Sequence, residues 1–160
     1  MGTFDIAQIC LNGHVITEMA GGHPEYRKEF CIDCGEKTIM SCQNCNTNIR
    51  GYHNIPGVIG FFDYHKPKYC EKCGHPFPWT SLQLESAKEL IDLTENLNFD
   101  EKIELKSSID DLIKDGPKTV VAQAKYKKYI GKAGIEIGKG IKDILVDVVS
   151  ETVKKAIWGQ

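Results

Sequence analysis

The chain has 160 residues, of which 41% are hydrophobic and 26% charged, and its formal net charge is −2 at pH 7. These values are ordinary for a globular protein of one or two domains, and the near-zero charge gives no overall sign of nucleic-acid binding. No stretch approaches the roughly 20 apolar residues of a membrane helix, and we find no pattern of a secretory signal. We therefore expect a protein that does not insert into a membrane.

The first 79 residues contain all 7 cysteines of the chain. Three pairs have the spacing Cys-x-x-Cys, and in a further pair a histidine follows a cysteine after three residues. Together they supply eight metal ligands: Cys10, His14, Cys31, Cys34, Cys42, Cys45, Cys70 and Cys73. Two tetrahedral Zn²⁺ ions require this number and type of ligand. We predict an α+β protein in which residues 1–79 form tandem zinc ribbons, with short β-hairpins around two structural zinc ions.

Other roles for the cysteines fit the pattern less well. Their odd number argues against a disulfide framework, and repeated Cys-x-x-Cys motifs without a βαβ pattern argue against a redox site. Ligation of iron stays open. Two pairings are also open, because a zinc could join consecutive pairs or, as in a RING-like cross-brace, alternate pairs. We favour consecutive pairs, since only the short link 35–41 separates the second pair from the third. Reduced, zinc-binding cysteines indicate the cytoplasm.

Residues 48–65, before the last ligand pair, combine cations with aromatic side chains. The cations are Arg50, His53 and His65, and the aromatic residues are Tyr52, Phe61, Phe62 and Tyr64. Such a mixture suits stacking and cation–π contacts with RNA bases or with a peptide, and Tyr52 and Tyr64 are the candidates for base stacking. The competing interpretation is that Val58, Ile59, Phe61 and Phe62 form the small core of the second ribbon, because zinc ribbons have little other core.

The second predicted domain, residues 80–160, has helical periodicity. Capping-box patterns at Thr80 with Gln83 and at Asn98 with Glu101 predict helices over about 81–97 and 99–114, which we expect to form an antiparallel hairpin. Apolar residues then recur with a period near 3.6, which predicts a long amphipathic helical segment over about 119–158. Four glycines between residues 131 and 140 interrupt it and indicate a break or a close helix–helix approach.

Charge is segregated along this helical half. Acids dominate residues 85–115, whereas residues 118–142 contain seven lysines and one acid. In one interpretation the basic segment docks on the acidic hairpin, within a chain or between chains of a homo-oligomer. In the other, Lys125, Lys127 and Lys128 contact RNA together with neighbouring tyrosines. Acids return beyond residue 142, which argues against a membrane-bound basic helix.

The Cys-x-x-Cys-Gly turns resemble those of zinc ribbons in general. The chain as a whole resembles an uncharacterised bacterial family of small double zinc-ribbon proteins with a helical C-terminal half. The likeness lies in Ala7–His14, Ile49–Tyr52 and Ala87–Asp92. This resemblance implies a metal-binding domain in a bacterial, cytoplasmic protein, and it implies no particular activity.

Our leading hypothesis is a zinc-ribbon protein that binds a protein or RNA partner through residues 48–65 and self-associates through its helical half. Zinc would be structural, because four protein ligands leave no position for water. The alternative is a metal-independent endoribonuclease effector, of the toxin or phage-defence type by analogy. In that case His53 and His65 would transfer protons and Arg50 would stabilise phosphate charge.

Overall fold

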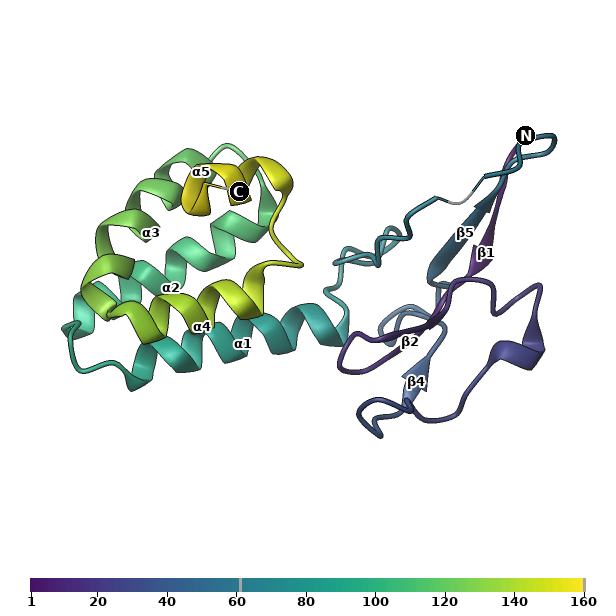
Figure 1. The fold of residues 1–160 in the computed structure, drawn as a ribbon, viewed down its shortest axis with the longest axis horizontal. Coiled ribbons are helices and arrows are strands. Elements are labelled where there is room, and N and C mark those ends of the chain that lie inside the picture. Colours follow the sequence, from purple (N-terminus) through teal and green to yellow (C-terminus); the bar gives the residue numbers. More distant parts are fainter. Residues whose placement is uncertain (61, 160) are drawn as a thin grey trace. The chain divides into compact units, whose positions relative to one another are not determined.

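The computed structural model describes residues 1–60 and 62–159. It confirms the α+β class, with small antiparallel sheets in the N-terminal half and helices in the C-terminal half (Figure 1). The chain divides into two compact units, Met1–Ser81 and Leu82–Gln160. Phe61, one of the aromatic residues singled out in the sequence, lies outside the described residues.

The strands of the first unit are short and form two small sheets. One sheet pairs β1 (Thr3–Ile6) with β5 (Arg50–Asn54), antiparallel, as Figure 1 shows. In the other, β2 (Gln8–Cys10) lies between β3 (Val15–Thr17) and β4 (Thr38–Ile39). A one-turn 3₁₀ helix covers Pro24–Tyr26. The β1–β5 sheet brings the first residues of the chain beside a segment about fifty residues later, as the pairing of Phe4 with His53 illustrates.

Gly51 in β5 is needed for the close approach of neighbouring backbone. A Cβ atom at this position would lie 2.2 Å from the carbonyl oxygen of Glu18 and 2.8 Å from the backbone nitrogen of Ala7. The N–H of the next residue, Tyr52, donates a hydrogen bond to the same Glu18 carbonyl over 2.8 Å. The backbone of Glu18 is thereby fixed against β5.

Of the apolar residues of segment 48–65, the buried core of the first unit takes Ile49 but not Val58, Ile59 or Phe62. Its buried cluster consists of Ala7, Ile9, Ile39, Cys42, Ile49, Cys70, Phe77 and Trp79. The rings of Phe77 and Trp79 stack with centroids 4.8 Å apart, and Trp79 Nε1 donates to the carbonyl of Pro67. Val58, Ile59 and Phe62 are 50%, 104% and 51% exposed, so the interpretation that they form the ribbon core is wrong.

The first two helices are α1 (Pro78–Leu93) and α2 (Phe99–Lys114). At α2 the capping box forms as expected, with Asn98 Oδ1 accepting from the Glu101 N–H and Glu101 Oε2 accepting from the Asn98 N–H. The expected box at Thr80 does not form, because the Thr80 hydroxyl donates to the carbonyl of Lys68 instead. Helix α1 therefore starts earlier than the expected residue 81, with Pro78 in the first helical position that proline favours.

The segment expected over 119–158 contains three helices: α3 (Thr119–Ala133), α4 (Ile135–Leu145) and α5 (Glu151–Trp158). Gly134, with φ 110°, separates α3 from α4, in line with the break that the glycines indicated. The second break has no glycine. It follows Leu145, and the Ser150 side chain caps α5 by accepting a hydrogen bond from the Val153 N–H.

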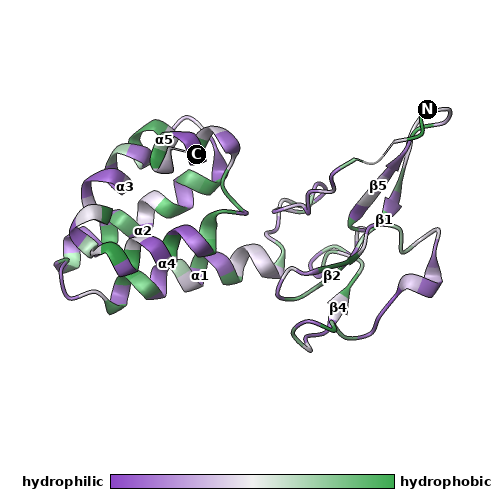
Figure 2. Ribbon diagram, in the orientation of Figure 1, coloured by the Kyte–Doolittle hydropathy of each residue, from purple (hydrophilic) through white to green (hydrophobic). Residues whose placement is uncertain are grey.

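The helical unit encloses its own core, and α2 packs most extensively against α3. Hydrophobic and hydrophilic residues alternate along its helices (Figure 2). Lysines of α3 pair with acids of α2, since Lys125 Nζ lies 2.7 Å from Glu104 and Lys132 Nζ lies 2.5 Å from Glu101. The basic segment thus docks on the acidic one within the chain. In the described residues, none of the helices has the length and apolarity needed to cross a bilayer.

Candidate metal centres and an aromatic pocket

The three Cys-x-x-Cys turns share one backbone conformation. The residue after the second cysteine has positive φ in each: 74° at Gly35, 61° at Asn46 and 73° at Gly74. Its N–H donates to the carbonyl of the first cysteine over 2.8–2.9 Å. Glycine and asparagine tolerate this left-handed conformation better than other residues. The tight turn directs both thiols of each pair to the same side.

The first ligand pair uses a different turn. The Cys10 N–H donates to the carbonyl of His14 over 2.9 Å, and the His14 N–H donates to Cys10 Sγ over 3.2 Å. These bonds bring His14 Nδ1 to 3.5 Å from Cys10 Sγ. An imidazole and a thiol therefore approach one another as the two thiols do in the other pairs.

The four pairs combine into two clusters of four donors, in which the ligand atoms lie within 4.8 Å of one another. We call Cys10, His14, Cys31 and Cys34 the first cluster, and Cys42, Cys45, Cys70 and Cys73 the second cluster. Each joins pairs that are consecutive along the chain. Both clusters could hold a metal ion.

The donor spacing fits a tetrahedral ion. Bonds of about 2.3 Å to sulfur and about 2.0 Å to nitrogen would separate two sulfurs by about 3.8 Å, and a sulfur from a nitrogen by about 3.5 Å. Observed sulfur–sulfur distances are 3.8 Å for Cys10–Cys34, 3.7 Å for Cys42–Cys73 and 3.6 Å for Cys45–Cys70. In the first cluster, His14 Nδ1 lies 3.5 and 3.6 Å from its two neighbouring sulfurs.

An asparagine amide contacts the last cysteine of each cluster. Asn12 Nδ2 donates to Cys34 Sγ, and Asn44 Nδ2 donates to Cys73 Sγ, both over 3.5 Å. Each asparagine lies two residues after the first ligand of its cluster. The sequence analysis missed this pair, although the repeated Cys-x-Asn pattern was the signal for it. Such outer contacts orient ligands and stabilise negative charge on sulfur.

The thiols of the two clusters differ in how readily they ionise. Hydrogen bonding from the Thr47 side chain, followed by the Thr47 backbone, lowers the pKa of Cys45 to about 6. Hydrogen bonding from the Glu36 backbone lowers the pKa of Cys34 to about 7. Burial raises the pKa of Cys42 to about 11, so ionisation of this thiol at neutral pH depends on a bound cation. Each cluster thus contains at least one thiol whose lowered pKa favours the thiolate form that binds metal.

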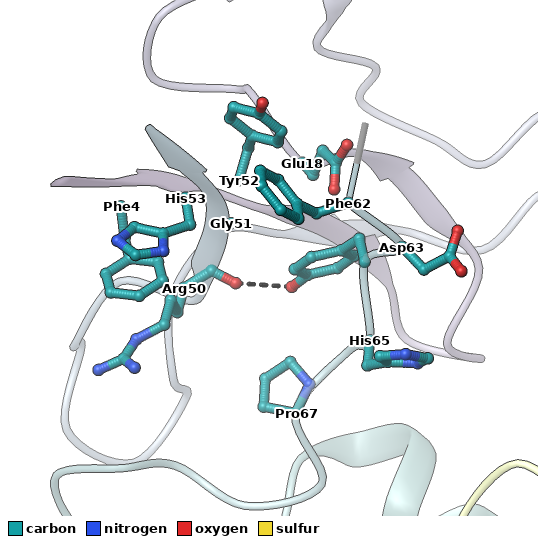
Figure 3. Close-up of a pocket in the computed structure, with 11 residues that line it drawn as sticks. Phe4, Glu18, Arg50, Gly51, Tyr52, His53, Phe62, Asp63, His65 and Pro67 are labelled. Carbon is teal, nitrogen blue, oxygen red and sulfur yellow. Dashed lines mark hydrogen bonds between the residues drawn. The ribbon is translucent and has the colours of Figure 1, made fainter. Parts of the chain in front are cut away.

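The predicted recognition and catalytic residues of segment 48–65 meet at a pocket of about 240 Å³ in the same unit (Figure 3). We call it the aromatic pocket. It is lined by Phe4, Glu18, Arg50, Gly51, Tyr52, His53, Phe62, Asp63, Tyr64, His65 and Pro67. Sequence reasoning found six of these side chains and missed Phe4, Glu18 and Asp63. Phe4 reaches this segment through pairing of β1 with β5, and Glu18 through its backbone contact with Tyr52.

The two tyrosines link β5 to the later part of segment 48–65. The Tyr64 hydroxyl donates to the carbonyl of Arg50 over 2.6 Å, and the Tyr52 hydroxyl donates to the carbonyl of Gly60 over 3.0 Å. Burial, followed by the nearby charge of Glu18, raises the pKa of Tyr64. Both hydroxyls are therefore engaged as donors to backbone carbonyls, and the two rings remain in the pocket wall.

The candidates for catalysis do not converge. His53 stacks on Phe4 with centroids 4.2 Å apart, and the Arg50 guanidinium lies 4.2 Å from the same ring and pairs with Glu71. His65 is at the opposite side of the pocket and points away from His53 (Figure 3). The arrangement gives the two imidazoles no common point at which one would act as base and the other as acid.

In the helical unit, the three lysines predicted to contact RNA have different surroundings. Lys125 is engaged by Glu104, whereas Lys127 and Lys128 are exposed on α3. The same unit contains an apolar groove of about 400 Å³, which we call the glycine groove. It is lined by Tyr126, Ile130, Gly131, Gly134, Ile135, Gly138, Lys139, Lys142, Ile157 and Trp158.

The fold and the clusters define a small α+β protein with two ribbon-like Cys/His centres, each able to hold a metal ion, and a helical unit. The chain belongs to DUF2321, an uncharacterised protein family conserved in bacteria, whose profile matches residues 3–157. This confirms the resemblance drawn from the sequence, and the match spans both units. Comparison with curated proteins and with solved structures found no match.

Proposed function

We propose that this protein is a binding module in which two structural Zn²⁺ ions hold the N-terminal unit and segment 48–65 binds a protein partner. One observation carries the proposal: both clusters present four donors at the separations of a tetrahedral ion. Four protein ligands fill the coordination shell of zinc, so the ions have a structural role and do not activate water.

Zinc is the ion that suits these donors best. Thiolate and imidazole ligands in tetrahedral geometry are typical of structural zinc sites. Elemental analysis of protein purified without added metal is expected to give two zinc ions per chain. Iron in their place, or a content below two, would contradict this part of the proposal.

The exposed apolar residues of segment 48–65 support a protein partner. Val58, Ile59 and Phe62 project from the segment although the unit has a core of its own. Exposed apolar residues that gather on one segment mark interaction surfaces. RNA is a poorer match, because Glu18 and Asp63 line the pocket and Arg50 is already paired with Glu71.

The second part of the proposal is self-association of the helical unit through the glycine groove. Ile135 in its wall is 89% exposed, and a Cβ atom at Gly131 would meet nothing within 4 Å. Small residues on neighbouring turns allow a helix of a second copy to come close. Sedimentation equilibrium is expected to show a dimer that dissociates on dilution.

Photocrosslinking tests the partner surface. Benzoylphenylalanine in place of Ile59 is expected to yield a discrete cross-linked protein in bacterial cells that express the chain. The matched control is the same substitution at Tyr26, an exposed aromatic residue of the same unit that is 47% accessible. If ribonuclease removes the cross-linked species, the partner of this surface is RNA and not a protein. Equal cross-linking from both positions would refute a specific surface.

A further inference from the structure

The Glu18 side chain is partly buried, and the hydrogen bonding of one of its carboxylate oxygens is incomplete. Its Oε2 atom is shielded from solvent and has no hydrogen-bond partner among the described residues. The carboxylate lines the aromatic pocket together with Tyr52, Phe62 and Tyr64 (Figure 3). A buried carboxylate oxygen without a donor is unfavourable, so a ligand that supplies a positive donor would be stabilised here.

The surroundings of Glu18 favour a cation. Asp63 adds an exposed acid at the rim of the pocket, with its carboxylate pointing away from Glu18 (Figure 3). Arg50 lies against Phe4 and Glu71 and points away from Glu18 (Figure 3). The charge of Glu18 also contributes to raising the pKa of Tyr64, in keeping with a carboxylate close to that ring. An anionic ligand would be repelled by Glu18, whereas a cation would pair with it.

The aromatic rings provide the second element of cation recognition. Because the hydroxyls of Tyr52 and Tyr64 are committed to backbone carbonyls, these side chains offer ring surface to a ligand. Phe62 adds a ring without a polar group. Aromatic faces attract ammonium groups through the ring quadrupole, and the attraction strengthens when the cation loses water.

We propose that the aromatic pocket binds an alkylammonium group, supplied by a lysine side chain of the protein partner. The ammonium would bond Glu18, and its methylenes would lie against Tyr52, Phe62 and Tyr64. A volume of about 240 Å³ suits the end of one side chain. The claim that a lysine of the partner supplies the ammonium group rests on the proposed function of segment 48–65. The claim that the pocket binds an ammonium group depends on the pocket alone.

Titration with butylammonium chloride, followed by NMR of zinc-loaded protein labelled at the Glu carboxyl and aromatic carbons, tests the site. We expect saturable shifts of Glu18, Tyr52 and Phe62, and none with 1-butanol, a neutral probe of the same size. Glu18→Gln is expected to weaken butylammonium about tenfold, because it removes the charge from a charge-assisted bond. Glu25→Gln, at an exposed acid of the same unit, serves as control and should leave the affinity unchanged.

Phe62→Leu provides an independent variant, since Phe62 is half exposed and its replacement keeps an apolar side chain. It should weaken butylammonium without changing zinc content. Equal shifts with 1-butanol, no saturable shifts, or full affinity in both Glu18→Gln and Phe62→Leu would overturn the ammonium site.

Cross-linking from position 59 in the Glu18→Gln background separates this inference from the proposed function. Loss of both butylammonium binding and the cross-link supports a lysine of the partner. If the cross-link persists while butylammonium binding is lost, the partner surface stands and the lysine anchor is refuted. If butylammonium binds but position 59 of the wild-type chain yields no cross-link, the ammonium comes from a free amine and the protein-partner proposal fails.

Discussion

The side-chain amide of Asn44 donates a hydrogen bond to Cys73 Sγ over 3.5 Å. This contact crosses the second cluster, because the asparagine belongs to one Cys-x-x-Cys turn and the cysteine to the other. It is the largest cause of a lowered pKa at Cys73. Asn12 makes the equivalent contact with Cys34 in the first cluster, so the two centres share an outer donor as well as ligand spacing.

Replacement of Asn44 by alanine should weaken zinc binding at the second cluster by about 10–100-fold, the usual effect of losing an outer-shell partner of a metal ligand. Competition with a chromophoric chelator measures the affinity. Gln43→Ala changes an exposed amide in the same turn and is expected to have no effect. If Asn44→Ala binds zinc with unchanged affinity, the Asn44 amide does not stabilise the zinc-bound form of the second cluster.

Substitution of Cys42 by serine should remove one zinc ion and unfold the second ribbon. Cys42 is both a ligand and a member of the buried cluster, and apparent binding energies of structural zinc are about 10–16 kcal/mol. Elemental analysis and circular dichroism measure the two effects. Cys34→Ser should remove the other zinc instead, and a Cys42→Ser protein with two zinc ions and native melting would refute the ligand assignment.

The helical unit should lose stability in acid, because the ion pair between Glu101 and Lys132 is lost when Glu101 is protonated. Hydrogen bonding from Lys132 lowers the pKa of Glu101 below its ordinary value. The ion pair therefore stabilises the fold fully above the pKa of Glu101 in the unfolded chain, which is about 4.3. This stabilisation is lost as the pH falls through the lower pKa of Glu101 in the folded chain. Glu101→Gln keeps the capping geometry but removes the charge.

Urea unfolding of the wild-type chain and of Glu101→Gln, followed by helical circular dichroism from neutral pH to about pH 3, measures this dependence. We expect the difference in stability between them to shrink as the pH falls. Glu95→Gln, at an exposed acid of the same unit, controls for general charge effects. A difference that stays constant with pH would exclude the ion pair as its cause.

Gly131→Ala should stabilise an isolated helical unit by up to about 1 kcal/mol, because glycine is a poor residue within a helix and the new methyl group enters open space. Gly140→Ala is the matched comparison in α4. Its Cβ would lie 2.9 Å from Leu90 Cδ1, so the gain in helix propensity is offset by crowding. Thermal unfolding at low concentration distinguishes the two variants.

The same glycine tests self-association. Gly131→Leu fills the glycine groove with a side chain that a second copy would have to displace. We expect sedimentation equilibrium to show a weaker dimer, with the monomer still folded. An unchanged dimer affinity would show that the two copies associate through another surface.

The features that the sequence predicted well are those encoded within a few residues. The Cys-x-x-Cys spacing and the Asn98 capping box depend on single turns, and both form as expected. The glycines of the basic segment indicated a break, and Gly134 provides it. The start of α1 was misplaced because the Thr80 hydroxyl finds a tertiary partner in the carbonyl of Lys68.

Features that depend on distant residues were not predictable in this way. The pocket acquires Phe4 and Glu18 only through pairing of β1 with β5 and through the close approach at Gly51. The exposure of Ile59 depends on a core already filled by Phe77 and Trp79, residues beyond the last ligand. Local composition identified segment 48–65 as unusual, but it could not tell an inward from an outward face.

Segment 48–65 begins after Cys45 and ends before Cys70, two ligands of the second cluster. An ion bound there would close the segment into a loop and reduce the conformational entropy of its free state. Metal binding and partner binding are then linked equilibria, and each raises the affinity for the other by the same factor. A bound partner would slow zinc loss, and depletion of zinc would release the partner, so occupancy of this surface would follow the zinc supply of the cell.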